Sequence, residues 1–551
     1  MRLNQFKSAK GSDIMKLVAS CQNHQVLFTM VDDPSVTYQA GLQEFLEFCE
    51  EQGAVVFAHS ILRNFGELTP YLFDCGFDCI ASDDSFKKRK NAFKKVESRE
   101  GQVLRIEVKL QKKIVKFYDS KKLFNSTEEE LRNSFQVEGD NLQVVAKCLQ
   151  FLEEQGLDKN TIGSNAWFNY IETKFGNIHR AKRVFVELDE DAEDLARRGF
   201  RGGWCYLNPK AENKSFSGFC FDINSMYPWI MYDHALPVYE PVRFEGEPDW
   251  NDKRYPLFIV EVVLDYAIIK EGCFPWLVSD YQLEKVVEND YIEKRLKPVR
   301  AVLTNMELEL LFQTYDFGNI TYKKGYKFKA SKSLFKEYVS KWYQQKNNSF
   351  GAKKQVAKMM LNNLFGKFAT KKTYKSQIFY ISPTDGIEYK RELGEAPGSS
   401  LSYYTPMATF IAAYGRCKVI YTAMANKETF LYSDTDSVHL SIDSIEEANW
   451  MEVHDSNLGF WKVERQFEDS KFLGLKCYAE KEVNGDWVFK VAGLPKSSQE
   501  KLTIDQFYQG AEIEFEIAQK IPGGVGTSTG KFTIGKSAIG RIAYLEKLRH
   551  K

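Results

Sequence analysis

The sequence lacks several features that would assign it to a familiar class of protein. Its ten cysteines are scattered, and the closest pair, Cys75 and Cys79, has no second pair to complete a zinc site. No uninterrupted apolar stretch approaches membrane-spanning length, and the polar N-terminal stretch MRLNQFKSAKGSD lacks the apolar core of a signal peptide. We therefore expect a soluble intracellular protein with reduced thiols and no membrane contact.

Net charge is also absent, because 75 Lys and Arg residues balance 75 Asp and Glu residues. The distribution is more informative, with basic clusters at 87–95, 322–333 and 367–375. Tyrosine and phenylalanine alternate with lysine in the second cluster, which suits a surface that follows phosphates and stacks bases. A solvated charged face is the alternative interpretation of each cluster.

A chain of 551 residues is too long for one hydrophobic core and predicts several domains. Short apolar strands and amphipathic helices alternate over about the first 160 residues, which predicts an α/β domain. Strand-rich sequence follows, and a long helical region is expected over about 334–369. A β-hairpin is expected around the TDG turn at 384–386, and a helix over 405–425.

Two carboxylates stand one residue apart in FLYSDTDSVHL, where Asp434 and Asp436 lie between an apolar run and a β-branched one. Aspartate and serine are common turn residues, so a solvated hairpin tip is one interpretation. Paired carboxylates that bind metal ions are the other.

A third carboxylate, Asp222, ends an apolar strand in FDINSMYPWIM, and Tyr227 follows on the next turn. An aspartate at a strand-to-helix turn is well placed for a cation and a phosphate. The alternative is an Asx turn followed by a buried tyrosine.

The segment 353–368 is expected to form a helix with one face suited to a nucleotide. At about 100° per residue, that face carries Lys354, Lys358, Asn362 and Phe365. Val356 and Met360 fall on the opposite, buried side, and Lys346 lies near the polar face if the helix extends back so far. Cations, an amide and a ring on one face can hold a polyphosphate and stack a base, although a solvated basic face is the alternative.

These three elements together are the parts of two-metal phosphoryl transfer, in which metals held by carboxylates act on a triphosphate. DINSMYP, KMMLNNLFG and YSDTDS resemble motifs A, B and C of family B DNA polymerases, in the family's order. LKCYAEK resembles the family's later K-x-Y element.

Four further segments, RGFRGGW, KGYKFKASKSLFK, YTPM and IPGGVGTSTGKFTI, are similar to the protein-primed branch, the replicases of small phages with linear genomes. The resemblance covers nearly the whole chain, apart from a tail after about Gly535.

The resemblance implies an α/β and α+β multidomain fold of the right-hand polymerase type, with palm, fingers and thumb. It also implies an N-terminal RNase H-like domain of the exonuclease type and two terminal-protein-region insertions. The expected divisions are the exonuclease-like domain 1–161, palm 162–233, first insertion 234–334, fingers 335–369, second hairpin insertion 370–404, palm 405–491, and thumb with C-terminal tail 492–551.

The resemblance also implies roles for individual residues. The catalytic metal ligands would be Asp222, Asp434 and Asp436. The dNTP would be bound by Tyr227, Lys346, Lys354, Lys358, Asn362 and Phe365, with Tyr227 excluding a 2′-hydroxyl. Primer and template contacts would come from Thr405, Tyr432, Lys476, Tyr478, Arg201, Gly202 and Gly203.

Phe365 and Phe200 depart from the branch, which usually has tyrosine at both positions. Each loses a hydroxyl and keeps its ring, so we expect tuned base-pair or template contacts and retained activity. The implied cofactors are two Mg²⁺ ions, with Mn²⁺ as a substitute. The implied partners are a DNA template-primer, dNTPs and a terminal protein that supplies the priming hydroxyl. We expect a monomer or a heterodimer with that protein, in the host cytoplasm.

The N-terminal domain departs from the family pattern at its proofreading carboxylates. Ser60 and Asn64 occupy the Asn and Asp positions of H-N-x3-D, and Val137 and Asn141 occupy the Tyr and Asp positions of Y-x3-D. Asp13 is the nearest approach to the missing Asp-x-Glu, and Asp119 alone survives.

Asparagine cannot supply the anionic oxygens that two divalent ions need. We therefore expect the domain to be a scaffold without proofreading activity. A misplaced register of these motifs is the alternative.

Three other functions stay open. Reverse transcriptases and nucleic-acid-primed polymerases also use a carboxylate hairpin, although reverse transcriptases usually have adjacent aspartates and Thr435 separates the pair here. A non-catalytic DNA-binding replication protein is the third alternative, and intact carboxylates in both polymerase motifs argue against it.

Overall fold

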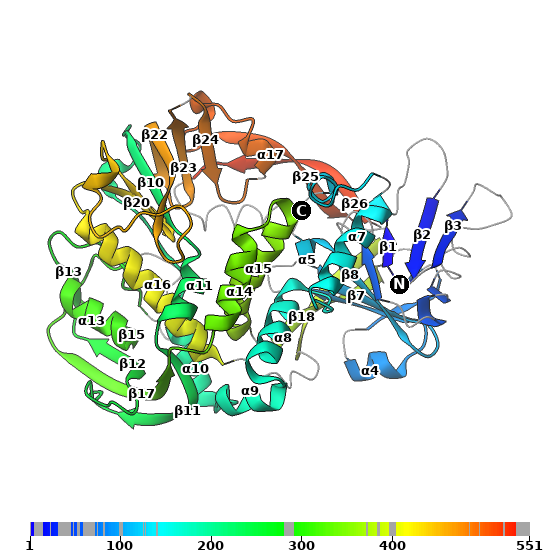
Figure 1. Ribbon diagram of the computed structural model, residues 1–551, viewed down its shortest axis with the longest axis horizontal. Coiled ribbons are helices and arrows are strands. Elements are labelled where there is room, and N and C mark those ends of the chain that lie inside the picture. Colours follow the sequence, from blue (N-terminus) through cyan, green and yellow to red (C-terminus); the bar gives the residue numbers. More distant parts are fainter. Residues whose placement is uncertain are drawn as a thin grey trace.

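The computed structural model describes residues 2–4, 15–21, 24–30, 46–47, 49–51, 55–58, 72–73, 75–80, 83–97, 103–124, 126, 128–138, 141–279, 291–370, 373–382, 386–395, 404–483, 485–494, 496–521 and 524–535. Helices and strands mix throughout this part of the chain, as the sequence predicts (Figure 1). None of the helices in these ranges is long and apolar enough to cross a membrane.

A seven-stranded antiparallel sheet carries the acidic motifs. In spatial order its strands are β24 (Trp487–Val491), β23 (Cys477–Glu482), β22 (Trp461–Gly474), β10 (Gly218–Ile223), β21 (Ser437–Leu440), β20 (Phe430–Thr435) and β9 (Trp204–Leu207). The two motif strands β10 and β21 are neighbours in the middle of the sheet although they are far apart in sequence. The core residues Phe221, Val438 and Leu440 of these strands are completely buried.

Helix α16 (Thr405–Ala425) packs beside this sheet and is buried along most of its length (Figure 1). Its second residue is Pro406, which lacks an N–H that the first helical turn would leave unpaired in any case. Among the described residues, four shorter helices contact it: α10 (Glu190–Gly199), α11 (Met226–Asp233), α13 (Asn305–Thr314) and α15 (Gly351–Phe368).

A second sheet follows α11 in the chain and lies across α16 from the first (Figure 1). Its antiparallel strands are, in spatial order, β11 (Leu236–Glu245), β17 (Ile320–Ser331), β12 (Leu257–Leu264) and β15 (Val299–Thr304). A smaller sheet beside it contains β14 (Lys294–Arg295), β13 (Ala267–Ile269) and β16 (Tyr315–Asp316).

Two helices occupy the region expected to be helical over about 334–369. They are α14 (Lys336–Asn347) and α15 (Gly351–Phe368), so Lys346 lies on a separate helix from the polar face of 353–368. The two helices are separated because Gly351 has a φ of 54°, which lies in the left-handed region and interrupts a right-handed helix. The amphipathic prediction for α15 is confirmed, since Val356 and Met360 are fully buried. Helices α8 (Ile162–Phe175) and α9 (Ile178–Val184) pack nearby.

The N-terminal part contains a three-stranded sheet of β1 (Arg2–Asn4), β2 (Met15–Cys21) and β3 (His24–Met30). A seven-stranded sheet follows, formed by β4 (Val55–Ala58), β5 (Asp78–Cys79), β6 (Ala92–Glu97), β7 (Val103–Lys109), β8 (Ile114–Asp119), β18 (Thr373–Ser382) and β19 (Gly386–Glu395). The hairpin β18–β19, expected from the TDG turn, joins this sheet by pairing with β6.

Short helices complete the N-terminal part: α4 (Asp83–Lys88), α5 (Lys121–Phe124), α6 (Glu128–Phe135) and α7 (Asn141–Glu154). At the other end of the chain, α17 (Lys496–Gln499) precedes a long hairpin of β25 (Glu512–Ile521) and β26 (Gly524–Thr533). Single 3-10 turns lie at Pro209–Ala211, Ile445–Glu447 and Ile504–Gln506.

Candidate active site

The sheet places the acidic residues in one row. Lys462, Asp222, Ser437, Asp434 and Cys205 are successive cross-strand partners on β22, β10, β21, β20 and β9. Because cross-strand partners point to the same face, these side chains share one surface of the sheet. Asp222 and Asp434 are thus brought together from distant parts of the sequence.

Asp436 joins this row from the turn between β20 and β21. Thr435 has a φ of 67°, which allows the tight turn, and the Ile223 N–H donates to the Asp436 carbonyl at 2.9 Å. Burial raises the pKa of both Asp222 and Asp436, and each is raised further by neighbouring carboxylates that include Glu464. The ionised forms of both carboxylates are therefore disfavoured unless further positive charge is supplied.

Asp434 stands two residues away in a different environment. Burial opposes its ionisation, but hydrogen bonds from Lys476 and Cys205 outweigh this and lower its pKa. Lys476 Nζ lies 2.5 Å from Asp434 Oδ1, and Cys205 Sγ and Thr435 Oγ1 each donate to the same oxygen at 3.0 Å. This carboxylate is already paired, in contrast to its neighbours.

The donor set suits a hard divalent cation, because Asp222 and Asp436 are partly buried carboxylates and the charge of Asp436 raises the pKa of Asp222. In the described part of the chain, no group of three or more acidic, histidine or cysteine side chains is arranged to hold a metal ion. The structure thus brings Asp222 and Asp436 together, whereas the Asp434 side chain is engaged by Lys476.

A cluster of lysines faces the carboxylates. Lys346 Nζ donates to Ser225 Oγ at 3.0 Å, and its pKa is lowered to about 8 by burial and by the charges of Lys358, Lys462 and Lys354. Lys358 in turn lowers the pKa of both Asp222 and Asp436. The lysines predicted from α15 and α14 therefore converge although they lie on separate helices.

Aromatic rings border the same space. Tyr227 stacks on Phe365 with ring centroids 4.4 Å apart at 24°, and Phe200 approaches Phe365 at 6.3 Å. Asn362 is exposed on α15, one turn before Phe365. Both predicted departures from the family pattern, Phe200 and Phe365, therefore meet in one aromatic group.

Lys476 is held by a polar contact of its backbone. Its φ of 55° is unusual for a lysine, and its N–H donates to the Tyr432 hydroxyl at 2.8 Å. Tyr432 is fully buried and packs against Tyr478 with centroids 5.1 Å apart. Tyr432 therefore contacts the Lys476 backbone directly, and Tyr478 packs against Tyr432.

Thr405 is also fully buried, and its hydroxyl donates to Glu193 at 2.8 Å.

The RGG segment reaches the catalytic turn through Gly203. A Cβ on Gly203 would lie 2.6 Å from Thr435 Cγ2, whereas one on Gly202 would meet no atom within 4 Å. The backbone therefore approaches the turn at Thr435 closely at Gly203, whereas Gly202 has free space around it.

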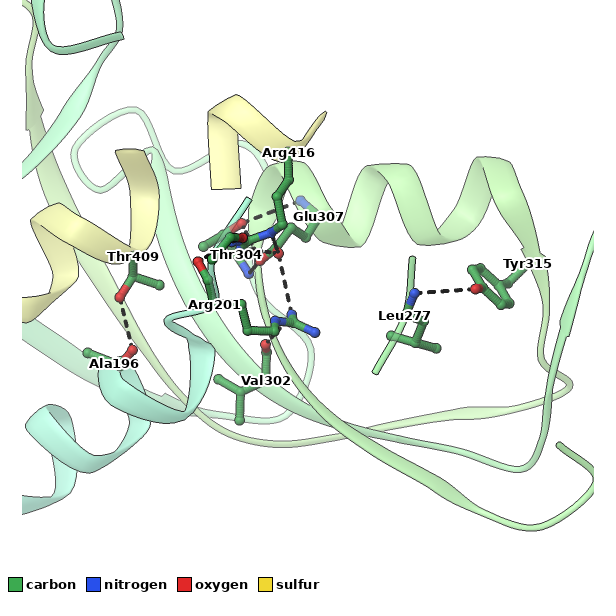
Figure 2. Close-up of polar contacts among 10 residues, drawn as sticks. Ala196, Arg201, Leu277, Val302, Thr304, Glu307, Tyr315, Thr409 and Arg416 are labelled. Carbon is green, nitrogen blue, oxygen red and sulfur yellow. Dashed lines mark hydrogen bonds and ion pairs between the residues drawn. The ribbon is translucent and has the colours of Figure 1, made fainter. Parts of the chain in front are cut away.

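A buried ion cluster anchors the same segment from behind. Figure 2 shows Arg416 and Arg201 converging on Glu307, with Arg416 Nη2 at 2.6 Å and Arg201 Nη2 at 3.3 Å from Glu307 Oε1. Arg416 Nη1 also donates to the carbonyls of Arg201 and Gly202 at 2.5 and 2.9 Å. Glu307 further closes a capping box with Thr304 at the start of α13.

The predicted proofreading positions are only partly described. Asp13, Ser60 and Asn64 lie outside the described residues, as do the side chains of Asp119 and Asn141. Asp119 ends β8, Asn141 begins α7, and Val137 packs as a partly buried apolar residue against the main core.

Sequence reasoning missed Glu464, Lys462 and Cys205. The charge of Glu464 raises the pKa of Asp222 and that of Lys462 lowers it. Burial and the charge of Asp436 have larger effects on the same pKa. All three residues lie on strands that only the sheet topology brings beside motifs A and C. The sequence offered one signal for these residues, the alternating polar side chains in WKVERQ. Their position in the sequence gives no link to Asp436.

Residues 142–450 match the family described as DNA polymerase type B, organellar and viral. The DNA polymerase of Bacillus phage phi29 is 33% identical over 419 residues, covering 72% of this chain and 71% of the relative. This chain belongs to the type B DNA polymerases. The DNA polymerase of Bacillus phage Nf is 32% identical over 393 residues, 67% of each chain.

Solved structures agree with this assignment. Phi29 DNA polymerase complexed with primer-template DNA and incoming nucleotide substrates superposes with a TM-score of 0.80 and 28% identity, covering 90% of this chain and 93% of that one. An orthorhombic crystal form of the same enzyme superposes with a TM-score of 0.81 and 27% identity, covering 97% of this chain and 100% of that one. The resemblance to the protein-primed phage branch and the right-hand fold that it implies are confirmed, and the enzyme is a DNA-directed DNA polymerase.

Proposed function

We propose that this polymerase replicates a linear phage-type genome by protein-primed, strand-displacing synthesis and has lost proofreading. The observation that carries the catalytic part is the meeting of Asp222 and Asp436, two partly buried carboxylates that repel one another, with the lysines of α14 and α15. Such an unneutralised pair beside a cationic surface is suited to divalent cations and a triphosphate.

Asp222 and Asp436 would hold two Mg²⁺ ions, with Mn²⁺ as a substitute. When bound, these ions lower the pKa of the attacking hydroxyl and stabilise the charge that develops on the transferred phosphorus. Asp434 completes the site at its edge, where Lys476 and Cys205 fix one of its oxygens.

Lys346, Lys354 and Lys358 would bind the triphosphate of the incoming dNTP. Burial and the neighbouring lysines lower the pKa of Lys346, and this repulsion is relieved when phosphate oxygens arrive. Tyr227, supported by its stack on Phe365, would lie beneath the deoxyribose and exclude a 2′-hydroxyl, while Asn362 and Phe365 border the nascent base pair.

Lys476 would steady the primer terminus, with Tyr432 and Tyr478 supporting it from the core. Arg201, Gly202, Gly203 and Thr405 would orient the template-primer through the RGG segment and the start of α16. The solved structure of phi29 DNA polymerase described above contains primer-template DNA and incoming nucleotide substrates, which supports the same substrates for this enzyme.

A terminal protein would dock on the first insertion, 234–334, and present its hydroxyl to the same site, so that the enzyme acts as a monomer or a heterodimer in the host cytoplasm. The hairpin of residues 370–404 would encircle DNA and permit strand displacement. The exonuclease-like domain, 1–161, would act as a scaffold.

Primer extension tests the catalytic assignment. Wild-type enzyme with Mg²⁺, dNTPs and a DNA primer-template should extend the primer, and Asp436→Ala should not. Equal extension by both would overturn the proposal. Matched RNA and DNA templates separate reverse transcription, because this enzyme should copy the DNA template only.

Two further assays test the finer assignments. Labelled dNTP, Mg²⁺ and the product of the neighbouring candidate gene, without a nucleic-acid primer, should yield a nucleotide linked covalently to that protein. A primer with a mismatched 3′ end should stay intact with Mg²⁺ and no dNTP, and Mg²⁺-dependent shortening would contradict the loss of proofreading.

A further inference from the structure

A pocket of about 510 Å³ lies between α11, α16 and the segment 450–461, and the proposed reaction does not use it. Its aromatic lining consists of Trp229, Trp450, Phe460 and Trp461, and its charged lining of Lys418 and Glu452. A volume of this order matches the several hundred Å³ of ordinary small-ligand sites.

The pocket is built against the turn that carries Asp222. Asn224 donates its N–H to the Phe460 carbonyl at 2.9 Å, and its own carbonyl accepts the Gly459 N–H at 3.0 Å. The Asn224 side chain also donates to the His454 carbonyl at 2.8 Å. The loop is therefore fastened to the motif A turn on the side away from the row of carboxylates.

One wall is a flat indole resting on a glycine. Gly459 has a φ of 82°, and a Cβ there would lie 2.2 Å from Trp229 Cδ1, so no other residue leaves room for the ring. Trp450 is 70% exposed, with a φ of 60°, at another part of the lining. Indole faces presented in this way favour a flat aromatic ligand, because stacking on tryptophan is favourable for every planar ring.

The charged lining groups are unused by the protein. Among the described residues, neither the Lys418 ammonium nor the Glu452 carboxylate forms a hydrogen bond or ion pair, and the two are not within 4.0 Å of each other. Burial lowers the pKa of the half-buried Lys418, and the charge of Glu452 opposes this shift. Trp461 is 1% exposed, and its indole N–H has no partner in the described part of the chain.

We propose that this pocket is a second nucleotide site, separate from the substrate site, that binds a guanine nucleotide. The base would stack on the Trp229 and Trp450 indoles, its N1–H and N2 amino group would donate to Glu452, and its phosphate would pair with Lys418. Guanine is favoured because a carboxylate only accepts hydrogen bonds, and guanine alone presents two adjacent donors on that edge. Adenine and cytosine place an acceptor beside their amino group, and thymine flanks its single N–H with carbonyls.

Tryptophan fluorescence of the full-length protein in EDTA, titrated with GMP, tests this site without metal-dependent binding at the carboxylates. We expect saturable quenching by GMP, with an affinity at least about tenfold higher than for AMP, CMP or TMP. Glu452→Gln should weaken GMP binding by about tenfold or more and leave AMP unchanged. As the matched control, Glu428→Gln makes the same chemical change beyond the C-terminal end of α16 and outside the pocket, and it should leave GMP binding unchanged.

Two comparisons separate this site from the polymerase site. Lys418→Ala should weaken GMP binding and leave guanosine binding unchanged, because only the phosphate contact is removed. Lys358→Ala should leave GMP binding intact, since Lys358 faces Asp222 and Asp436. No saturable quenching, equal affinity for all four nucleotides, or loss of binding in Lys358→Ala would each overturn the proposal. Primer extension is scored separately, so failure here leaves the polymerase assignment unaffected.

Discussion

Two carboxylate sites near α16 differ in what neutralises them. Glu307 is 1% exposed, and two arginines more than offset its burial and lower its pKa. Asp222 and Asp436 are only partly buried, and burial and neighbouring carboxylates raise the pKa of both. The first group is complete within the protein, whereas the second requires charge from outside it.

This difference separates a carboxylate that the fold neutralises from two that it does not, which supports the metal-binding role proposed for those two. Glu307 joins α13, α16 and the RGG segment in one network (Figure 2). Among the described residues, no ion pair neutralises the Asp222 or Asp436 carboxylate, and the charge of Asp436 raises the pKa of Asp222. Asp434 lies between these two cases, because Lys476 pairs with it and its pKa is lowered.

The largest expected effect is on activity, from Asp436→Asn. We expect the rate of incorporation to fall roughly a thousandfold or more, about 4 kcal/mol of transition-state stabilisation, because a metal ligand loses its charge. The denaturation midpoint should stay equal or rise, because a buried repulsion is removed. Single-turnover primer extension and urea unfolding measure the two effects. A lower midpoint would show that Asp436 is a structural residue.

Glu307→Gln should have the opposite profile. It leaves Arg416 and Arg201 buried beside a neutral amide, so we expect a loss of about 3 kcal/mol in the free energy of unfolding. Urea unfolding measures the loss, and Glu309→Gln, on the exposed side of the same helix, is the matched control. Unchanged stability in Glu307→Gln would remove the contrast between the two groups.

The contact between the RGG segment and the catalytic turn can be broken at one glycine. Gly203→Ala forces a methyl group against Thr435, and overpacking of about 1–3 kcal/mol would slow incorporation roughly ten- to a hundredfold. Gly202→Ala has free space and should behave as wild type. Partial rescue by Thr435→Gly, which suits the φ of 67°, would confirm the contact; equal effects of the two alanines would refute it.

The smallest expected effect concerns pH. The pKa of Lys346 is lowered to about 8, so its ammonium is present at pH 7 and is lost as the pH rises through 8. We therefore expect the KM for dNTP to rise about tenfold between pH 7 and 9. Lys346→Arg stays protonated throughout this range and should flatten the profile. A wild-type profile that is already flat would contradict this role of Lys346.

Much of the site could be predicted from sequence because its motifs are local. Asp434 and Asp436 occupy one tight turn, and Lys354, Lys358, Asn362 and Phe365 follow the period of one helix. The helical region over about 334–369 is confirmed, but its division into α14 and α15 could not be predicted, because the sequence does not reveal that Gly351 has a positive φ. Lys346 still reaches the site, through the packing of α14 against α15.

The remaining features depend on contacts between distant segments. Cys205 and Asp434 become partners only because β9 pairs with β20, and Glu464 joins the site only because β22 pairs with β10. Neither residue belongs to a motif with a recognisable spacing. Likewise, the pairing of β18 with β6 extends the N-terminal sheet with a hairpin from the other half of the chain.

By itself, the sequence determined the family, the order of the motifs and the residue types available for chemistry, since these reside in short segments with their own turn and helix preferences. Tertiary structure alone decided which of the charges are neutralised. Burial and neighbouring charges set that balance, and both arise where strands and helices meet. Asp434 and Asp436 are therefore nearly equivalent in the sequence, and only the fold pairs the first with Lys476 and leaves the second for a ligand.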